Sequence, residues 1–209
     1  MKKSLMNYET LLTLTQRISM SREFEEIALL TVTGVRDALQ CKGCALFLMN
    51  PKTQELEIAA STGLSGEYLN KGPISAMRSI AEALKEGPVA VTDVADDPRI
   101  QYPEAARKEG IASILAVPMR THEDPIGALR LYTSERVEFS LDDVNFVQAV
   151  AQIAAMAIEM GRLYRGLKSS IEILKASRDL SQVGTKRWTP YEGVPHSAGK
   201  LHGGGQPGA

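Results

Sequence analysis

The stretch 88–132, PVAVTDVADDPRIQYPEAARKEGIASILAVPMRTHEDPIGALRLY, decides the fold of this chain of 209 residues. Its breakers lie where a unit of strand, loop, short helix and two strands needs them. Pro103 and Gly110 bracket a helical turn, because proline favours the first helical position and glycine the position just past the end. Asp124 and Pro125 separate the last two strands. The expected strands are 89–91, 111–119 and 126–133.

The same stretch resembles the C-terminal half of a GAF domain, a small-molecule sensing module. The residues that carry the resemblance are Asp93-Val94, Asp97-Pro98-Arg99, Tyr102-Pro103-Glu104-Ala105, Glu109-Gly110-Ile111 with Ser113, Val117-Pro118 and Ile126-Gly127-Ala128-Leu129. The resemblance implies an α+β fold of the GAF (PAS-like) type, with a central antiparallel sheet of five or six strands covered by helices and long N- and C-terminal helices. It also implies a ligand pocket between the sheet and its second layer.

The chain before this stretch alternates between helical and strand periodicity. The apolar residues predict helices over 4–19, 21–39 and 75–86. The continuous apolar run 44–49 is typical of a strand covered on both faces, and a turn at 50–53 joins it to an alternating strand that starts at Glu55. We therefore divide the chain into an N-terminal helix, a GAF domain, an extension of the last helix and a disordered tail rich in glycine and proline. These segments are 1–20, 21–160, 161–180 and 181–209.

The last helix begins at a capping box, in which Ser140 caps the helix and Asp143 takes the place of the usual glutamate. One stripe of small apolar residues, from Val144 to Ile158, fits against a sheet. A second set recurs in steps of three and four and forms a heptad seam: Phe146, Ala149, Ile153, Met156, Met160, Leu163, Leu167, Ser170 and Leu174. The seam predicts a two-stranded coiled coil. The alternative is that its first half belongs to the core. The expected dimer contacts are Met156, Met160, Leu163, Leu167 and Leu174.

The composition is that of an ordinary globular chain, with 44% hydrophobic and 23% charged residues and a formal net charge of −1. Near-neutrality argues against a nucleic-acid surface spread over the chain. No continuous apolar run approaches the roughly 20 residues of a membrane helix. Since no signal-peptide pattern is present either, we expect a cytoplasmic protein without a nucleic-acid or membrane partner.

Five residues are candidates for ligand contact. Arg130 shares one face of its strand with Tyr132, and a buried arginine there would need an anionic partner from the protein or from a ligand. The alternative is an edge arginine that reaches solvent along its alkyl stem. The resemblance places Arg99 and Tyr102 near the pocket mouth, although Asp97-Pro98 is also a turn with Arg99 as its local partner. Ser113, at the start of its strand, is equally open to a structural or a binding role.

The two cysteines, Cys41 and Cys44, supply two metal ligands where a structural zinc site usually has four. We expect Cys44 to be a small apolar residue of a buried strand. One GAF subclass reduces free methionine sulfoxide with cysteines, so an enzyme of that type is one rival interpretation. Its cysteines surround the pocket, whereas both thiols here precede the first strand. Neither the cyclic-nucleotide motif nor the bilin-attachment pattern of other GAF subclasses is present.

The sequence shows no motif of a hydrolase, a zinc protease or a phosphate-binding loop. We therefore predict a sensory domain, not an enzyme, that binds a small molecule or a partner and relays the change through a homodimer of its terminal helices. A downstream signalling protein is a possible partner, and the pattern names no cofactor. The second rival is a scaffold whose pocket is filled by its own side chains and which only dimerises.

Overall fold

The computed structural model describes residues 8–72, 74–75, 87–122 and 124–183. Its helices are α1 (Tyr8–Met20), α2 (Phe24–Leu39), α3 (Gly66–Leu69), α5 (Pro103–Lys108) and α6 (Leu141–Val183). Its strands are β1 (Gly43–Met49), β2 (Glu55–Thr62), β3 (Ile74–Ser75), β4 (Val89–Val91), β5 (Ser113–Thr121) and β6 (Asp124–Thr133). The predicted helix 75–86 lies outside the described residues except for Ser75, which belongs to β3. The predicted tail also lies outside them after Val183, where α6 ends.

The strands form one antiparallel sheet in the order β3-β2-β1-β6-β5-β4. The expected α+β architecture with five or six strands is therefore confirmed, and the sheet has six. The apolar run of β1 is buried along almost its whole length, as its lack of alternation predicted. The two longest strands, β5 and β6, pair through a hairpin, and β6 lies inside the sheet between β1 and β5.

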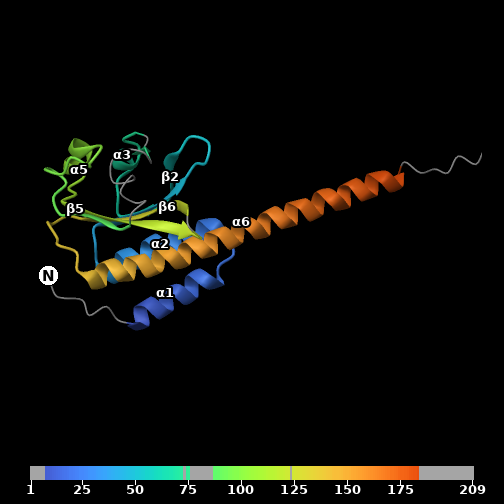
Figure 1. Ribbon diagram of the computed structural model, residues 1–209, viewed down its shortest axis with the longest axis horizontal. Helices are drawn as coiled ribbons and strands as arrows, with labels where there is room; N and C mark the ends of the chain where they lie inside the picture. Colours follow the sequence, from blue (N-terminus) through green and yellow to red (C-terminus); the bar gives the residue numbers. More distant parts are fainter. Residues whose placement is uncertain (1–7, 73, 76–86, 123, 184–209) are drawn as a thin grey trace, which may run out of the picture. The chain divides into compact units, whose positions relative to one another are not determined.

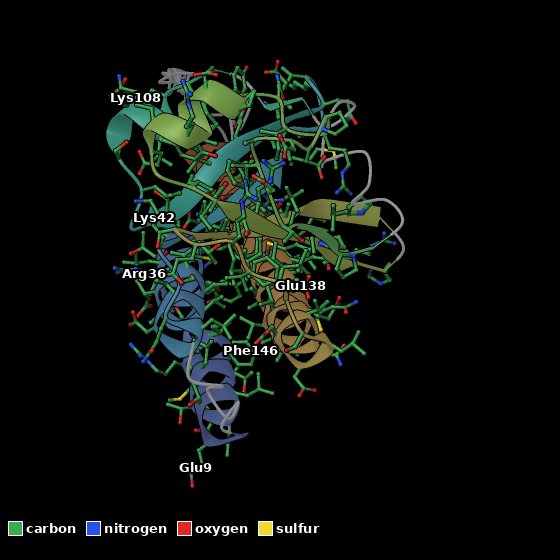
Figure 2. All side chains as sticks on the ribbon, turned by 90° about the vertical axis from the view of Figure 1, so that its left-hand side faces the viewer. Glu9, Arg36, Lys42, Lys108, Glu138 and Phe146 are labelled. Carbon is green, nitrogen blue, oxygen red and sulfur yellow. The ribbon has the colours of Figure 1, made fainter. Side chains whose placement is uncertain are left out.

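Helices cover one face of the sheet, and α3, α5 and the loops around them cover the other (Figure 1). On the helical face, Leu129 and Leu131 of β6 belong to one buried cluster with Val147 and Ala151 of α6. Figure 2 labels Phe146 between the helices and Lys108 in the opposite layer. Because both faces are covered, the buried apolar side chains of β1 and β6 divide between two separate cores.

The start of α6 follows the predicted capping box. The Ser140 hydroxyl accepts a hydrogen bond from the Asp143 amide at 3.2 Å, and the Asp143 carboxylate accepts one from the Ser140 amide at 3.0 Å. Of the predicted small stripe, Val147, Ala151, Ala154 and Ile158 are buried, and Val144 is partly buried against the same core. Phe146, the first member of the heptad seam, is only 1% exposed. The beginning of the seam thus belongs to the core, as the alternative interpretation had it.

The chain divides into two compact units, Met1–Gly166 and Leu167–Ala209, and the boundary falls within α6. In the first unit the seam residues Met156, Met160 and Leu163 are exposed. In the second unit Leu167 and Leu174 are exposed. The apolar seam therefore lacks a covering surface in each described unit taken by itself.

One segment of α6, Leu141–Ser177, is long and apolar enough to cross a membrane by length and composition alone. The mean hydropathy of its 18-residue window is 1.3, and 39% of that window is buried inside the protein. The core helix of a globular domain passes the same test, and the small stripe of α6 packs against the sheet. The expected absence of a membrane segment stays a prediction.

Gly127 allows β6 to approach β1. A β-carbon at this position would lie 2.1 Å from the carbonyl oxygen of Phe47 and 3.1 Å from the Cα atom of Leu48. Both neighbours are backbone, which cannot rotate away. We expect Gly127→Ala to lower the free energy of unfolding by about 1–3 kcal/mol or more, as overpacking does.

Chemical denaturation followed by circular dichroism measures this loss. Gly66→Ala is the matched control, because nothing lies within 4 Å of a β-carbon there and the position is helical. We expect the control to be neutral or stabilising by up to about 1 kcal/mol. Equal stability of the Gly127→Ala variant and the wild type would contradict the close packing of β6 on β1.

Candidate functional site

Arg130 lies in the middle of β6, on the sheet face covered by α3 and α5. Its partners on the two neighbouring strands are Ala45 of β1 and Ala116 of β5. Both alanines are fully buried and leave room above the sheet for a long side chain. Arg130 is only 6% exposed. It does not reach solvent from a sheet edge, and its guanidinium remains inside the protein.

The Arg130 guanidinium is incompletely paired. In the part of the chain that the structure describes, its Nε and Nη2 atoms are buried and have no hydrogen-bond partner. The guanidinium carbon lies 5.1 Å from the centre of the Phe47 ring, a cation–π contact that satisfies no N–H group. Arginine stays charged in proteins, and leaving a buried charge without a partner costs several kcal/mol. Such an arrangement is rare unless another group completes it.

Two tyrosines lie beside this guanidinium. The rings of Tyr68 and Tyr132 meet edge to face with their centres 5.8 Å apart, and side-chain hydrogen bonding links Tyr132 with both Tyr68 and Arg130. Burial raises the pKa of Tyr132 to about 12, although the nearby positive charge of Arg130 opposes the shift. Burial also raises the pKa of Tyr68. Both phenols therefore remain neutral hydrogen-bonding groups at physiological pH.

Lys71 provides a second positive charge, just after α3. Its ammonium donates a hydrogen bond of 3.0 Å to the Tyr68 carbonyl oxygen and lies 3.7 Å from the centre of the Tyr68 ring. Burial and then the charge of Arg130 lower the pKa of Lys71 to about 8, while Glu109 opposes the shift. The second of these causes is a repulsion between the charges of Lys71 and Arg130.

Glu109 is the acidic group whose charge reaches this cluster, and it is already engaged. Its carboxylate accepts a 2.9 Å hydrogen bond from the Ser65 amide and a second from the Ser65 hydroxyl. Burial pushes the pKa of Glu109 up, but these bonds and the nearby charges of Lys42 and Lys71 leave it below its ordinary value. The cluster thus holds two cations and one carboxylate bonded elsewhere.

An open cavity of about 480 Å³ adjoins the cluster. Its walls come from α3, from α5 and from the residues that follow each helix, and they include Tyr68, Lys71, Ala105 and Glu109. The volume falls within the range of small-molecule pockets. The described residues hold no group of three or more metal-ligating side chains, so no metal centre is indicated among them.

The other sequence candidates lie away from Arg130. The Ser113 hydroxyl donates to the Thr92 carbonyl at 2.6 Å and accepts from the Val137 amide at 2.9 Å, so backbone groups occupy it. Arg99 is half-exposed and paired with Asp97 at 2.5 Å, and hydrogen bonding to Arg99 lowers the pKa of that carboxyl. These contacts give both residues local structural roles, and a ligand role for either stays a prediction.

Tyr102 lies nearer the cluster. A β-carbon at Gly72 would be 2.7 Å from the Tyr102 hydroxyl, which places that hydroxyl against the loop that follows Lys71. Tyr102 also precedes α5 directly, as its N-cap. Its position beside this loop leaves it among the proposed ligand residues, together with Arg130 and Tyr132.

Sequence reasoning missed Lys71, Tyr68 and Phe47. The α3 helix has four residues, too few for a periodic pattern, and its capping serine is an ordinary turn signal. Phe47 looked like one more apolar residue of a buried strand. The alternation of β1 could have identified Phe47 as a neighbour of Arg130. Only alternate residues of that strand share the face of Arg130, and Phe47 is one of them.

Burial disfavours the thiolate form of both cysteines. Burial raises the pKa of Cys41 to about 11, and backbone hydrogen bonds oppose the shift only in part. Cys44 is fully buried in β1, where burial and the neighbouring Cys41 raise its pKa as well. Both thiols are protonated at neutral pH, whereas the thiolate is the nucleophile.

A titration of the lysine side chains tests the cluster. We expect the Cε–Hε signals of Lys71 to titrate near pH 8 in NMR spectra, while ordinary lysines titrate near 10.5. In Arg130→Met the midpoint rises, because one of its two depressing causes is gone. Arg107→Met, which removes a surface arginine paired with Glu104, leaves the midpoint unchanged. An unchanged Lys71 midpoint in Arg130→Met would place the two cations apart.

Alkylation by iodoacetamide at pH 8 tests the thiols. A pKa of about 11 in place of 9.0 lowers the thiolate fraction of Cys41 about 100-fold, so its alkylation is slower than in the unfolded chain by at least that factor. Cys44→Ser isolates Cys41 for this measurement, and Cys41→Ser isolates Cys44. Alkylation in the folded protein as fast as in urea would show a reactive thiol and favour the reductase interpretation.

Solved structures share this fold at low sequence identity. The GAF domain of a phosphoenolpyruvate-protein phosphotransferase from Coxiella burnetii matches with a TM-score of 0.70 at 20% identity, covering 79% of this chain and 99% of that one. Free methionine-R-sulfoxide reductase from Neisseria meningitidis matches with a TM-score of 0.67 at 20% identity, covering 78% and 95%. A bacteriophytochrome from R. palustris matches with a TM-score of 0.67 at 10% identity, covering 86% and 43%.

No curated protein matches the chain. The sequence model of the GAF domain matches residues 21–159. The range expected for the domain from the sequence is 21–160. That match spans well over half of the 209 residues, and it includes the strand that carries Arg130 and the short helix before Lys71. The chain therefore belongs to the GAF domain family.

Proposed function

We propose that this GAF domain is a sensory module that binds a small molecule between its sheet and the α3–α5 layer and relays the change through a homodimer of its terminal helices. The observation that carries the proposal is the buried Arg130 guanidinium, whose Nε and Nη2 atoms have no partner among the described residues. A bound small molecule would supply the missing partner. A domain that served only as a scaffold would gain stability from an apolar residue at this position.

The alternation of β6 connects such a ligand to the helices. Arg130 and Tyr132 face the α3–α5 layer, whereas Leu129 and Leu131 belong to the cluster that includes the buried stripe of α6. A ligand that draws Arg130 toward it also shifts the backbone that positions the two leucines. The relay requires only that the ligand prefers one arrangement of α6 over another by a few kcal/mol.

The exposed side of α6 supports the dimer. A largely apolar groove of about 580 Å³ lies along it, next to the junction of α1 and α2, with Met156, Met160 and Tyr164 in its wall. Met160 is 68% exposed, and Leu163 follows it on the seam. Exposed apolar residues in a continuous row are typical of an interface, since monomers rarely leave a large apolar patch in water. A second copy of α6 would cover the row with the same residues.

Native mass spectrometry of the full chain, purified from the organism that encodes it, tests both parts of the proposal. We expect a dimer that retains a small molecule. The double variant Leu163→Asp, Leu167→Asp should be a monomer, because it places two charges in the seam of each helix. Lys168→Asp changes the net charge by the same amount outside the seam and should remain a dimer.

A dimer without any bound small molecule, and without a thermal shift from any compound of a metabolite library, would support the scaffold interpretation. A double variant that still dimerises would remove the helix pairing. Light scattering across a range of protein concentrations checks the mass in solution for each variant. The two parts of the proposal can therefore fail separately.

A further inference from the structure

We propose that the ligand carries a carboxylate or phosphate group, that the Nε–Nη2 edge of Arg130 receives two of its oxygens, and that Lys71 supplies a second positive charge to it. The inference rests on the proposed function, because it presumes that a small molecule binds in this layer. It adds the chemical class of that molecule and the two residues that select it.

The pattern of unpaired atoms on Arg130 indicates the shape of the missing group. Nε and Nη2 together form the side edge of a guanidinium, where two N–H bonds run parallel. Arg99 uses the same two atoms in this protein: its Nε lies 2.9 Å from one oxygen of Asp97 and its Nη2 lies 2.5 Å from the other. Arg130 presents this edge inside the protein without a carboxylate among the described residues. A planar pair of oxygens is the group that this edge binds best.

The charges around Arg130 favour an anion over a neutral ligand. Lys71 lies close enough for the two cations to repel each other, and the carboxylate of Glu109 is held by Ser65. Among the described residues, the other neighbours of Arg130 include the ring of Phe47 and the phenol of Tyr132, which bring no negative charge at neutral pH. Since arginine cannot release its proton, an incoming anion would neutralise the charge that the described residues leave unpaired.

Lys71 and Tyr68 also line the cavity of about 480 Å³. A ligand in this cavity would therefore meet the cluster at Lys71. The ammonium of Lys71 is held by the Tyr68 carbonyl oxygen at 3.0 Å and by the face of the Tyr68 ring. An ammonium group has three N–H donors, and this carbonyl oxygen occupies one of them. A small oxyanion can therefore bind Lys71 from the cavity without displacing an acid of the described chain.

The experiment uses the full-length protein with two oxyanion probes, inorganic phosphate and succinate, and with uncharged succinamide as the matched control. We expect phosphate or succinate to raise the melting temperature with the logarithm of its concentration above the Kd, as binding to the native state requires, and succinamide to leave it unchanged. In the same samples the Arg130 Nε–Hε signal, assigned by its absence in Arg130→Lys, should move downfield with the active probe and not with succinamide.

Four variants separate the roles of these residues. Arg130→Lys keeps the charge and loses the side edge, so we expect the active probe to bind at least tenfold more weakly. Lys71→Met should also weaken it about tenfold or more, since one charge-assisted contact is lost. Arg107→Met, a surface arginine beside Glu104, should bind as the wild type does. Arg130→Met should melt at a higher temperature than the wild type without probe and lose its response to the probe.

The outcomes separate this inference from the proposed function. If native mass spectrometry finds a retained neutral molecule and neither probe acts, the oxyanion assignment is overturned while the sensory proposal stands. If the Arg130 Nε–Hε signal is already at a carboxylate-bonded position without probe, an acid of the protein fills the edge and the assignment is again overturned. If Arg130→Met fails to fold, the Arg130→Lys affinity and the wild-type signal still decide. Saturable binding that Arg130→Lys and Lys71→Met both weaken supports the inference.

Discussion

A positive charge inside the sheet is the constraint on which the rest of this domain depends. Arg130 cannot be neutralised by losing its proton, and the central position of β6 denies it a route to solvent. The layer above it must therefore be built around a cation. Aromatic faces, two phenols and a lysine surround the guanidinium, and no described acid meets its free edge. An apolar residue at this position would be easier to bury, so the charge is a cost to the stability of the domain.

The other face of the same strand is ordinary core. Leu129 and Leu131 pack with α6, whose small buried stripe brings the helix close to the sheet. One strand thus touches both a charged site and the helix that ends in an exposed apolar seam. This arrangement suits a sensor. Because β6 contacts both layers directly, a change in the layer on one of its faces needs no further element to reach the layer on the other face. At Gly127 the backbone of β1 approaches β6 so closely that a β-carbon would meet the carbonyl oxygen of Phe47.

Local patterns in the sequence were enough to predict the sheet, the hairpins and the helix cap. Breakers such as Pro103 and Gly110 act within a few residues, and strand alternation by itself assigns Arg130 to the face of Tyr132. The heptad seam was ambiguous because a core stripe and a dimer stripe have almost the same period. Phe146 belongs to the former, whereas Met160 is exposed. Lys71 could not be found, since its place beside Arg130 depends on the packing of a four-residue helix on a distant strand.

The two alanines that flank Arg130 carry a consequence of their own. Ala45 and Ala116 are the cross-strand neighbours, and their methyl groups set how closely the guanidinium can lie against the sheet. Related chains with bulkier residues at these two positions would lift the arginine toward the loops and into contact with water. The depth of the guanidinium would thus differ between such chains through residues that only flank it in the sheet. Depth, rather than chemistry, would be the first property of the site to diverge.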